Sequence, residues 1–435
     1  MIIPKEYSVE PNKIKEYDLK IKNKNENVEN NDKDEKEDIN ILIKNILNND
    51  ILNETKKEDL NKLILKIKST DINKIINNNN KLDIVFDLSN TCVFDYIINE
   101  EEYKKLLNQN LDKDMHFIIF NHNNKIIHDC VILRKGLYDF FQFSKSFCNF
   151  HINYLGIEIY LKEIMQILEN SMKIKFLKYK GRNDKDARYR KYLKDLNLDK
   201  NDTVIFDDNP CLWKEDHFNV IISKIFISKI FKEKENNLEY FLFNNFPFCY
   251  YKSNIDSNGQ INWNKQKLYG ERPPPFYYFN ENNESKDNDC YSSEYLDSSK
   301  YQFNYMKDIV KIIYYFVFTY NTSVPDILKL IRYNIFYKTY FNLSFYKGEK
   351  EILKHIIRNC GGKIYDDKIN NKFKDEKLFF VCRKEDYSFF KDKIKNEMLA
   401  YRISKVVNGK FILDSFYFMT SIENELIDQE YSFEN

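Results

Sequence analysis

Two groups of acidic residues stand at the ends of apolar, strand-like runs of this 435-residue sequence. The first run, DIVFDLSNTCVF, places Asp87, Ser89 and Thr91 in the spacing D-x-S-x-T, and the second, IFDDNPCLW, contains Asp207 and Asp208. A carboxylate nucleophile that approaches a dianionic phosphate needs a divalent cation to screen the repulsion. Carboxylates, carbonyl oxygens and water are the hard ligands that Mg²⁺ prefers. The two motifs therefore indicate phosphoryl transfer with Mg²⁺ as cofactor.

A lysine between the two acidic motifs completes the set. Lys191 lies in the run DARYRKYLKDL, which we expect to be helical. A lysine can neutralise the charge on the oxygens of a transferring phosphoryl group. Each motif alone is a weak signal, and the basic neighbours of Lys191 allow other registers. The ordered set within one α/β pattern is much more specific.

Strand-like and helical patterns alternate over residues 82–230. LDIVFD, MHFIIFN, NFHINYL and DTVIFDD resemble strands, whereas LYDFFQFSKSF, EIYLKEIMQILEN and DARYRKYLKDL resemble amphipathic helices. Continuous apolar strands that alternate with such helices are typical of a doubly wound α/β sheet. Ligand sites in these sheets lie at the carboxyl ends of the strands, which is where Asp87, Asp207 and Asp208 fall.

The length of the chain favours two or three compact units. Residues 1–80 are predicted to be a charged tail with one or two amphipathic helices between about 39 and 76. Residues 81–232 form the α/β domain, 233–300 a polar, low-complexity insertion or linker, and 301–332 a helical connector. Residues 333–430 form a separate small α/β unit.

Composition and charge exclude several kinds of partner. The formal net charge is +1, which makes no electrostatic case for tight binding of nucleic acid. No apolar run is long enough to span a membrane, and the N-terminus lacks the apolar run of a signal peptide. None of the eight cysteines belongs to a C-x-x-C pair or a zinc-type cluster, so we expect reduced, structural thiols. We therefore expect neither nucleic acid nor a membrane as a direct partner.

Residues 81–232 resemble the catalytic domain of the RNA polymerase II C-terminal-domain phosphatases, a family of the haloacid-dehalogenase superfamily. The family's D-L-D-x-T-L opening is represented by D-L-S-N-T-C from Asp87, and its R-P-G-L element by R-K-G-L from Arg134. A family strand ending in Y-T-x-G is represented by N-Y-L-G, which contains Tyr154. The family's lysine is followed by D-L or N-L, and Lys191 is followed by Y-L. The family closes with I-D-D and a Trp, which are represented here by F-D-D and Trp213.

The resemblance implies a Rossmann-like fold and a role for each matched residue. Asp87 would be the nucleophile that forms an aspartyl-phosphate, with Ser89, Thr91 and Lys191 as the other catalytic residues. Arg134 and Tyr154 would bind the substrate phosphate. The Mg²⁺ ligands would be Asp87, the main-chain carbonyl of Ser89, Asp207 and Asp208.

Two residues depart from the family pattern. Ser89 stands where the family has the aspartate that protonates the leaving oxygen and later activates water, a contribution of ~10²–10⁴-fold in rate. Tyr154 stands where the family has a threonine that contacts phosphate. These departures put turnover in question, whereas the side-chain metal ligands remain.

Three other residues near the motifs have structural interpretations as well. Arg134 could equally be a surface salt-bridge partner. Trp213 is expected to be a core or lid aromatic rather than a substrate contact. His151 lies in an apolar run and is expected to be a core histidine with a hydrogen-bond partner.

The C-terminal unit resembles a BRCT domain. It has a Gly pair after its first helix, the apolar run LFFVC, and NGKFILDSFYF, in which Phe411 holds the place of the family's Trp. An unrelated small α/β unit is the alternative. Ser344 and Lys391 match the phosphopeptide-binding residues of such modules poorly, because Phe345 replaces the expected Gly. We interpret both as structural or solvated.

Three functions follow from these patterns. The first is a nuclear, Mg²⁺-dependent protein Ser/Thr phosphatase that acts on the phosphorylated RNA polymerase II tail or another phosphoprotein. The second is a degenerate phosphatase, suggested by Ser89, that binds the phosphorylated tail or a partner as a scaffold. The third is a small-molecule phosphatase, which the BRCT-like unit makes less attractive. The nuclear localisation comes from the family resemblance alone.

Overall fold

The computed structural model describes residues 41, 54–76, 80–108, 113–122, 124–182, 190–213, 215–224, 226, 301–346, 350–365, 377–398 and 404–420. The chain divides into two compact units, Met1–Ser69 and Thr70–Asn435. In the first unit, α2 (Glu54–Ser69) is one of the helices expected before residue 76. Most of the predicted N-terminal tail and the predicted insertion 233–300 lie outside the described residues.

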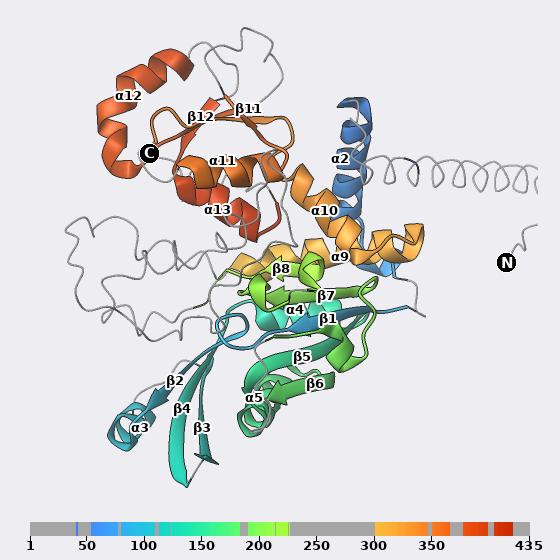
Figure 1. The fold of residues 1–435 in the computed structure, drawn as a ribbon, viewed down its shortest axis with the longest axis vertical. Coiled ribbons are helices and arrows are strands. Elements are labelled where there is room, and N and C mark those ends of the chain that lie inside the picture. The colour runs from blue at the N-terminus through green and yellow to red at the C-terminus, as the bar shows by residue number, and fades with distance from the viewer. Residues whose placement is uncertain are drawn as a thin grey trace, which may run out of the picture. The chain divides into compact units, whose positions relative to one another are not determined.

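The second unit contains the predicted α/β sheet (Figure 1). Five parallel strands stand in the order β6-β5-β1-β7-β8. The chain adds β5 and β6 on one side of β1 and then β7 and β8 on the other, so the strand order reverses between β1 and β7. Such a switch point opens a crevice at the carboxyl ends of the strands. The bounds of the strands are β1 Leu82–Phe86, β5 Cys148–Ile157, β6 Phe176–Arg182, β7 Thr203–Asp207 and β8 Val220–Ile222.

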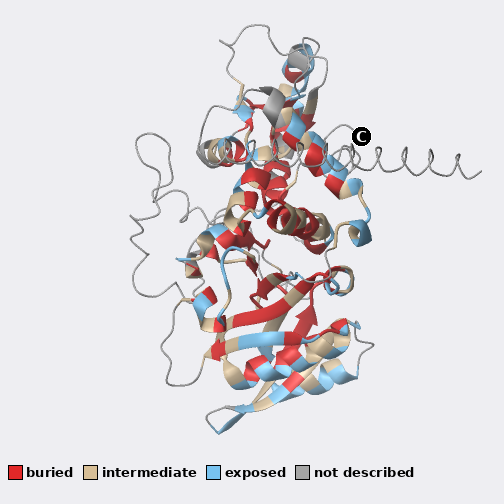
Figure 2. Cartoon of the chain, turned by 90° about the vertical axis from the view of Figure 1, so that its right-hand side faces the viewer, coloured by how far each residue is buried: buried red, intermediate tan, exposed pale blue. Residues whose placement is uncertain are grey.

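Aromatic side chains hold helices against this sheet. Phe86 of β1 stacks on Phe206 of β7 with ring centroids 5.3 Å apart. Phe140 of α4 (Leu137–Ser144) and Phe303 of α9 (Gln302–Tyr320) pack on Phe206 and on each other. α5 (Glu158–Met172) also buries its apolar face. Full burial of one such side chain contributes about 1.5–3 kcal/mol. Figure 2 shows the central strands and helices largely buried, whereas the edge strand β6 is partly exposed.

A second, antiparallel sheet is inserted after β1. Its strand order is β2-β4-β3, and a short helix follows β2. The run MHFIIFN is a strand, as predicted, but its assignment to the doubly wound sheet was wrong, because it pairs with a strand, β4, that the sequence did not reveal. An apolar run does not specify which strand will pair with it. The bounds are β2 Val93–Ile98, α3 Glu100–Leu107, β3 Met115–His122 and β4 Lys125–Leu133.

The run around Lys191 is not the predicted helix in its described part. Residues 190–192 are irregular, and only a 3-10 turn, η2 (Leu193–Leu196), follows. The amide of Lys191 donates to the carbonyl of Leu212, and the amide of Leu193 donates to the carboxylate of Asp216. Hydrogen bonds to partners distant in sequence therefore replace the helical ones.

The C-terminal part forms the predicted small α/β unit. Four parallel strands stand in the order β10-β9-β11-β12. The buried Phe411 packs on Phe336, Phe341 and Phe379 and thus anchors the last helix on the sheet, as expected for that position. The identity of this unit as a BRCT domain stays a prediction. The bounds are α10 Val324–Asn334, β9 Thr339–Asn342, α11 Lys350–Asn359, β10 Lys363–Ile364, β11 Lys377–Val381, α12 Lys384–Met398, β12 Ser404–Val407 and α13 Gly409–Tyr417.

A glycine ends α11 in the manner predicted from the sequence. Gly361 has a φ of 78°, in the left-handed region that glycine adopts without strain. A Cβ atom there would lie 1.8 Å from the carbonyl oxygen of Tyr333. The close approach of α10 therefore requires glycine at this position.

One hydrophobic cluster joins the five-stranded parallel sheet to the small C-terminal α/β unit. It contains Val85, Ile205 and Trp213 from the first and Phe341 and Phe411 from the second. A separate cluster fills the other face of the C-terminal sheet. The C-terminal unit thus has its own sheet but shares a core with its neighbour.

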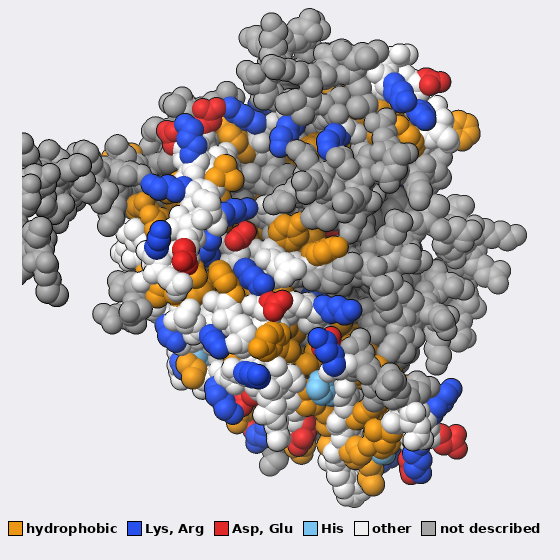
Figure 3. Space-filling view, turned by 180° about the vertical axis from the view of Figure 1, so that it is seen from behind, with side chains coloured by type: hydrophobic (Ala, Val, Ile, Leu, Met, Phe, Trp, Pro, Cys, Tyr) orange, Lys and Arg blue, Asp and Glu red, His pale blue; other side chains and the backbone are white. Residues whose placement is uncertain are grey.

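The face in Figure 3 mixes Lys and Arg side chains with acidic and hydrophobic ones. Among the helices that the structure describes, none combines the length and the apolar character needed to cross a membrane.

Candidate active site

Three carboxylates meet at the carboxyl edge of the parallel sheet. Asp87 directly follows β1, Asp207 ends β7, and Asp208 comes next. One oxygen of each lies within 4.8 Å of the others. The strands bring them together because Phe86 pairs with Phe206 and the Asp87 amide donates to the Phe206 carbonyl at 2.9 Å. Such a set of hard oxygen ligands fits Mg²⁺.

Lys191 reaches two of the three carboxylates. Its Nζ donates to Asp87 Oδ1 and to Asp207 Oδ2, each at 2.6 Å, and the side chain is 1% exposed. The positive charge of Lys191 thus faces three carboxylates. A divalent cation would balance the two negative charges that remain. The structure thus brings Lys191 to the acidic residues with which the sequence grouped it, although the helix predicted around it was wrong.

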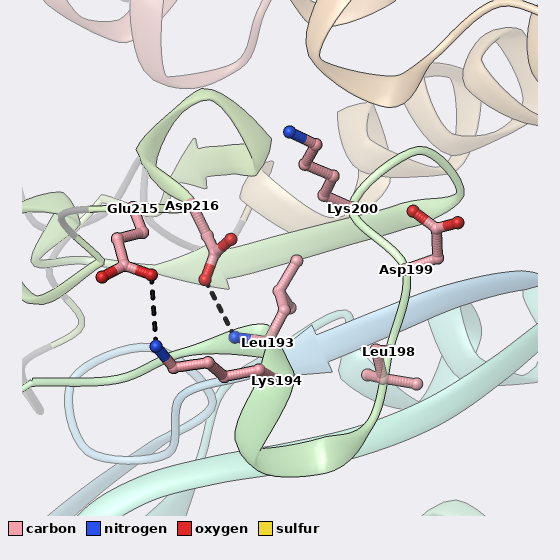
Figure 4. A pocket seen from close by; sticks show the side chains of 7 residues that line it. All are labelled: Leu193, Lys194, Leu198, Asp199, Lys200, Glu215 and Asp216. Carbon is pink, nitrogen blue, oxygen red and sulfur yellow. Dashed lines mark hydrogen bonds and ion pairs between the residues drawn. The ribbon is translucent and has the colours of Figure 1, made fainter.

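The loop that carries Lys191 is fixed from a second segment. Asp216 accepts a hydrogen bond from the Leu193 amide at 2.9 Å, and Lys194 pairs with Glu215 at 3.3 Å. Figure 4 shows these contacts around a shallow pocket beside η2. The pocket lies outside the acidic cluster, and its contacts serve to position the loop.

Burial and mutual repulsion set the charges of the cluster. Burial raises the pKa of Asp87 to about 7, although Lys191 opposes the rise. Burial, followed by the charges of Asp207 and Asp87, raises the pKa of Asp208 well above its ordinary value. Burial alone would lower the pKa of Lys191, but the two carboxylates raise it to about 12. Protons would therefore compete with a metal ion for these carboxylates.

Asp207 is held by further donors. Trp213 Nε1 donates to its Oδ2 at 2.7 Å, and the amide of Asn209 donates to its Oδ1 at 2.7 Å. Trp213 is a core residue, as expected, but its hydrogen bond to a carboxylate of the acidic cluster was not predicted. The signal available in the sequence was its short distance from the aspartate pair.

Thr91 connects the loop after β1 to the loop after β7 by hydrogen bonds. Its hydroxyl donates to Asp208 Oδ1 at 3.1 Å and accepts from the Asp208 amide at 3.0 Å. Arg134, behind the same loop, donates from Nη1 to the Thr91 carbonyl at 2.9 Å. The Arg134 side chain is buried, so its interpretation as a surface salt-bridge partner was wrong. Its contact with substrate phosphate stays a prediction.

The two positions that depart from the family pattern contact each other. Ser89 Oγ lies 3.2 Å from the hydroxyl of Tyr154. The Tyr154 ring lies over Gly156, where an added Cβ would come within 2.0 Å of a ring carbon. A further carboxyl, Asp95 of β2, lies beside Ser89. Burial raises its pKa, and a hydrogen bond from Ser89 opposes that rise. The sequence did not single out Asp95, because the fold of the antiparallel insertion brings it there.

His151 lies away from the acidic cluster. Its side chain is 1% exposed and its Nε2 lies 3.0 Å from Asp83, near the start of β1. It is the core histidine that the sequence predicted.

Residues 82–246 match the model of the NLI interacting factor-like phosphatase family. Among curated proteins none matches the chain significantly. Two solved structures are similar in shape, Fcp1, described as an essential RNA polymerase II CTD phosphatase, and fission yeast Fcp1 in a variant bound to beryllium fluoride. Both are 13% identical to this chain, and each match covers 85% of this chain and 98% of the solved one. The TM-scores are 0.45 and 0.46, respectively.

Likeness to solved structures at this level carries no conclusion about function, so the assignment depends on the family model and the site. The matched segment contains β1, β7, the acidic cluster and Lys191. Residues 82–246 therefore form a phosphatase domain similar to those of the NLI interacting factor-like family.

Proposed function

We propose that this protein is a Mg²⁺-dependent protein Ser/Thr phosphatase that works through an aspartyl-phosphate on Asp87. The observation that carries the proposal is the cluster of Asp87, Asp207 and Asp208 within 4.8 Å, with Lys191 bonded to two of them. It lies at the switch point of a parallel sheet, inside a segment that matches a phosphatase family.

Each group has a task in the proposed reaction. Asp87 attacks phosphorus, and Lys191 neutralises charge on the transferring oxygens. The carboxylates of Asp87, Asp207 and Asp208 and the main-chain carbonyl of Ser89 would hold the metal ion. When bound, Mg²⁺ would screen the repulsion between the nucleophile and the phosphate.

The substrate that we propose is the phosphorylated tail of RNA polymerase II or another phosphoprotein, in the nucleus. This part of the proposal is supported by the sequence motifs and by the BRCT-like pattern of the C-terminal unit. A docking module beside a phosphatase domain suits a protein substrate better than a small molecule.

A second candidate is a degenerate phosphatase that binds its phosphorylated partner without turnover. The observation in its favour is the hydroxyl of Ser89, bonded to Tyr154, at the position where the family has an acid. A serine hydroxyl cannot protonate an alkoxide leaving group at neutral pH, and loss of a general acid typically costs ~10²–10⁴-fold in rate.

Phosphate release with Mg²⁺ from p-nitrophenyl phosphate and from a phosphoserine heptad peptide separates the two candidates. The variants are Asp87→Asn, Ser89→Asp and, as a control, Asp139→Asn at an exposed carboxylate on α4. The aryl ester has a good leaving group and needs little acid catalysis, whereas the peptide needs it strongly.

Hydrolysis of both substrates by the wild type, lost in Asp87→Asn and kept in Asp139→Asn, supports the working phosphatase. Hydrolysis of the aryl ester only, with peptide hydrolysis gained in Ser89→Asp, supports the degenerate form. Intact-mass analysis under single-turnover conditions should then show a long-lived adduct of ~80 Da on the wild type. Failure of every form to release phosphate would refute the first candidate.

A further inference from the structure

The segment after β8 connects the two acidic loops to the C-terminal unit. The Ser223 amide donates to the carbonyl of Asp207 at 3.0 Å, and the Phe226 amide donates to the carbonyl of Asn90 at 2.7 Å. Asn90 stands between Ser89 and Thr91 and has a φ of 61°, an uncommon conformation for a residue other than glycine. This short segment thus touches the main chain of both loops that carry the metal site.

Lys224, in the middle of that segment, makes a buried ion pair. Its Nζ lies 2.7 Å from Asp414 Oδ1 on α13, and the two side chains are 1% and 0% exposed. Removal of one partner from such a pair leaves an uncompensated buried charge, which is strongly unfavourable. The pair spans 190 residues of sequence and joins the phosphatase domain to the last helix.

A buried glutamine bridges the same two elements. Gln302, at the start of α9, accepts a hydrogen bond from the Lys224 amide at 3.1 Å and donates to the carbonyl of Tyr417 at 2.9 Å. Close by, Tyr305 stacks on Phe418 with ring centroids 4.8 Å apart. Most of the shared core is apolar, and apolar contacts are non-directional. The polar contacts of Lys224 and Gln302 are directional, so they can fix the position of α13 along the segment after β8.

We propose that the Lys224–Asp414 pair couples the C-terminal unit to the metal site, so that both are positioning residues for the phosphatase reaction. This inference depends on the proposed function, which it deepens. The C-terminal unit would then be more than a docking module, because α13 holds the segment whose amides hold the Asp207 and Asn90 carbonyls.

The test uses the full chain with Asp414→Asn, with the double variant Lys224→Met/Asp414→Leu, and with Ile394→Ala as a control. Ile394 is a core residue of α12 on the opposite face of the C-terminal sheet, so its truncation lowers stability without touching the coupling. The double variant replaces the pair by apolar groups, which often leaves stability unchanged but removes the directional tie.

Two readouts are measured below the unfolding temperature. The first is hydrolysis of p-nitrophenyl phosphate as a function of Mg²⁺ and of substrate. The second is the fluorescence of Trp213, the residue that donates to Asp207, in a Trp263→Phe background that leaves it as the single tryptophan. This second readout needs no activity.

We expect Asp414→Asn and the double variant to need ~10-fold more Mg²⁺ for half-maximal activity, with a lower kcat and little change in KM, because outer contacts of metal ligands typically affect affinity by ~10–100-fold. Trp213 emission should change in both and stay unchanged in Ile394→Ala. If Asp414→Asn does not fold, the double variant gives the same test.

The inference is overturned if the double variant shows the same Mg²⁺ dependence and the same Trp213 emission as the wild type. The pair would then serve stability alone. If the wild type shows no phosphatase activity, the proposed function fails, and Trp213 emission still decides whether the pair acts on the metal site.

Discussion

Replacement of Asp208 by asparagine tests the charge balance of the proposed metal site. Asp208 is the third carboxylate of a cluster whose oxygens lie within 4.8 Å of one another, and Lys191 bonds to the other two. Asparagine keeps the shape and can still bond to Thr91, but it removes one negative charge. We expect the metal-free variant to be more stable than the metal-free wild type.

The size of the effect follows from Coulomb's law. At an effective dielectric constant of ~20, two unit charges 4.8 Å apart repel by about 3.5 kcal/mol. Asp208 has two such neighbours, and attraction to Lys191 offsets roughly one of them. The gain should therefore approach about 3 kcal/mol at high pH. It should shrink as the pH falls, because the raised pKa of Asp208 lets the wild type take up a proton and relieve the repulsion.

Thermal unfolding in EDTA and in Mg²⁺ measures this prediction. A ligand at 100 times its Kd stabilises a protein by about 2.7 kcal/mol, so Mg²⁺ should raise the stability of the wild type strongly. The variant has lost a metal ligand and should respond much less. The difference between the two proteins should therefore shrink or reverse when Mg²⁺ is added, whereas Asp139→Asn should follow the wild type throughout.

A lower stability of Asp208→Asn in EDTA at every pH would refute this reasoning. It would mean that the hydrogen bonds of the carboxylate outweigh the repulsion and that the cluster is a structural network. An equal response of both proteins to Mg²⁺ would place the metal elsewhere.

Three further predictions address the neighbours of the cluster. Lys191→Met should lower the stability of the metal-free protein at pH 8 by roughly 3–5 kcal/mol, since it leaves two buried carboxylates without their cation, and unfolding in EDTA measures this. The folded-state pKa of Asp87, raised from 3.8 to about 7, gives a stabilising contribution that is complete below about pH 4 and is lost as the pH rises through about 7. In EDTA, a change from pH 8 to pH 6 should thus raise the free energy of unfolding of the wild type by about 1 kcal/mol more than that of Asp87→Asn. Unfolding curves of both proteins at the two pH values measure this difference, and a difference of the opposite sign would contradict the prediction. Gly156→Ala should displace the Tyr154 ring, which lies 2.0 Å from the added Cβ, and change the KM for p-nitrophenyl phosphate more than Asp139→Asn does; an unchanged KM would argue against a role of Tyr154 near the substrate.

The sequence indicated that the three aspartates lie close together, because parallel strands align their carboxyl ends. Asp87 and the pair Asp207-Asp208 follow apolar runs that could be recognised as strands, and the fold brings them together as expected. Lys191 also lies beside these carboxylates, although the helix predicted around it is not formed.

The remaining parts depend on contacts between segments far apart in sequence. The antiparallel insertion could not be derived, because the apolar pattern of β3 does not identify β4 as its partner. The hydrogen bond from Trp213 to Asp207 and the place of Asp95 beside Ser89 arise only once the loops are folded. The Lys224–Asp414 pair joins two residues that have no pattern in common.

The central claim is that Asp87 is the nucleophile of a Mg²⁺-dependent phosphatase. Release of phosphate from p-nitrophenyl phosphate tests it most directly, because this substrate needs little help from the acid that Ser89 replaces. The account predicts release that requires Mg²⁺, survives in Asp139→Asn and is abolished in Asp87→Asn. Release that continues in Asp87→Asn, or that is unaffected by EDTA, would contradict it.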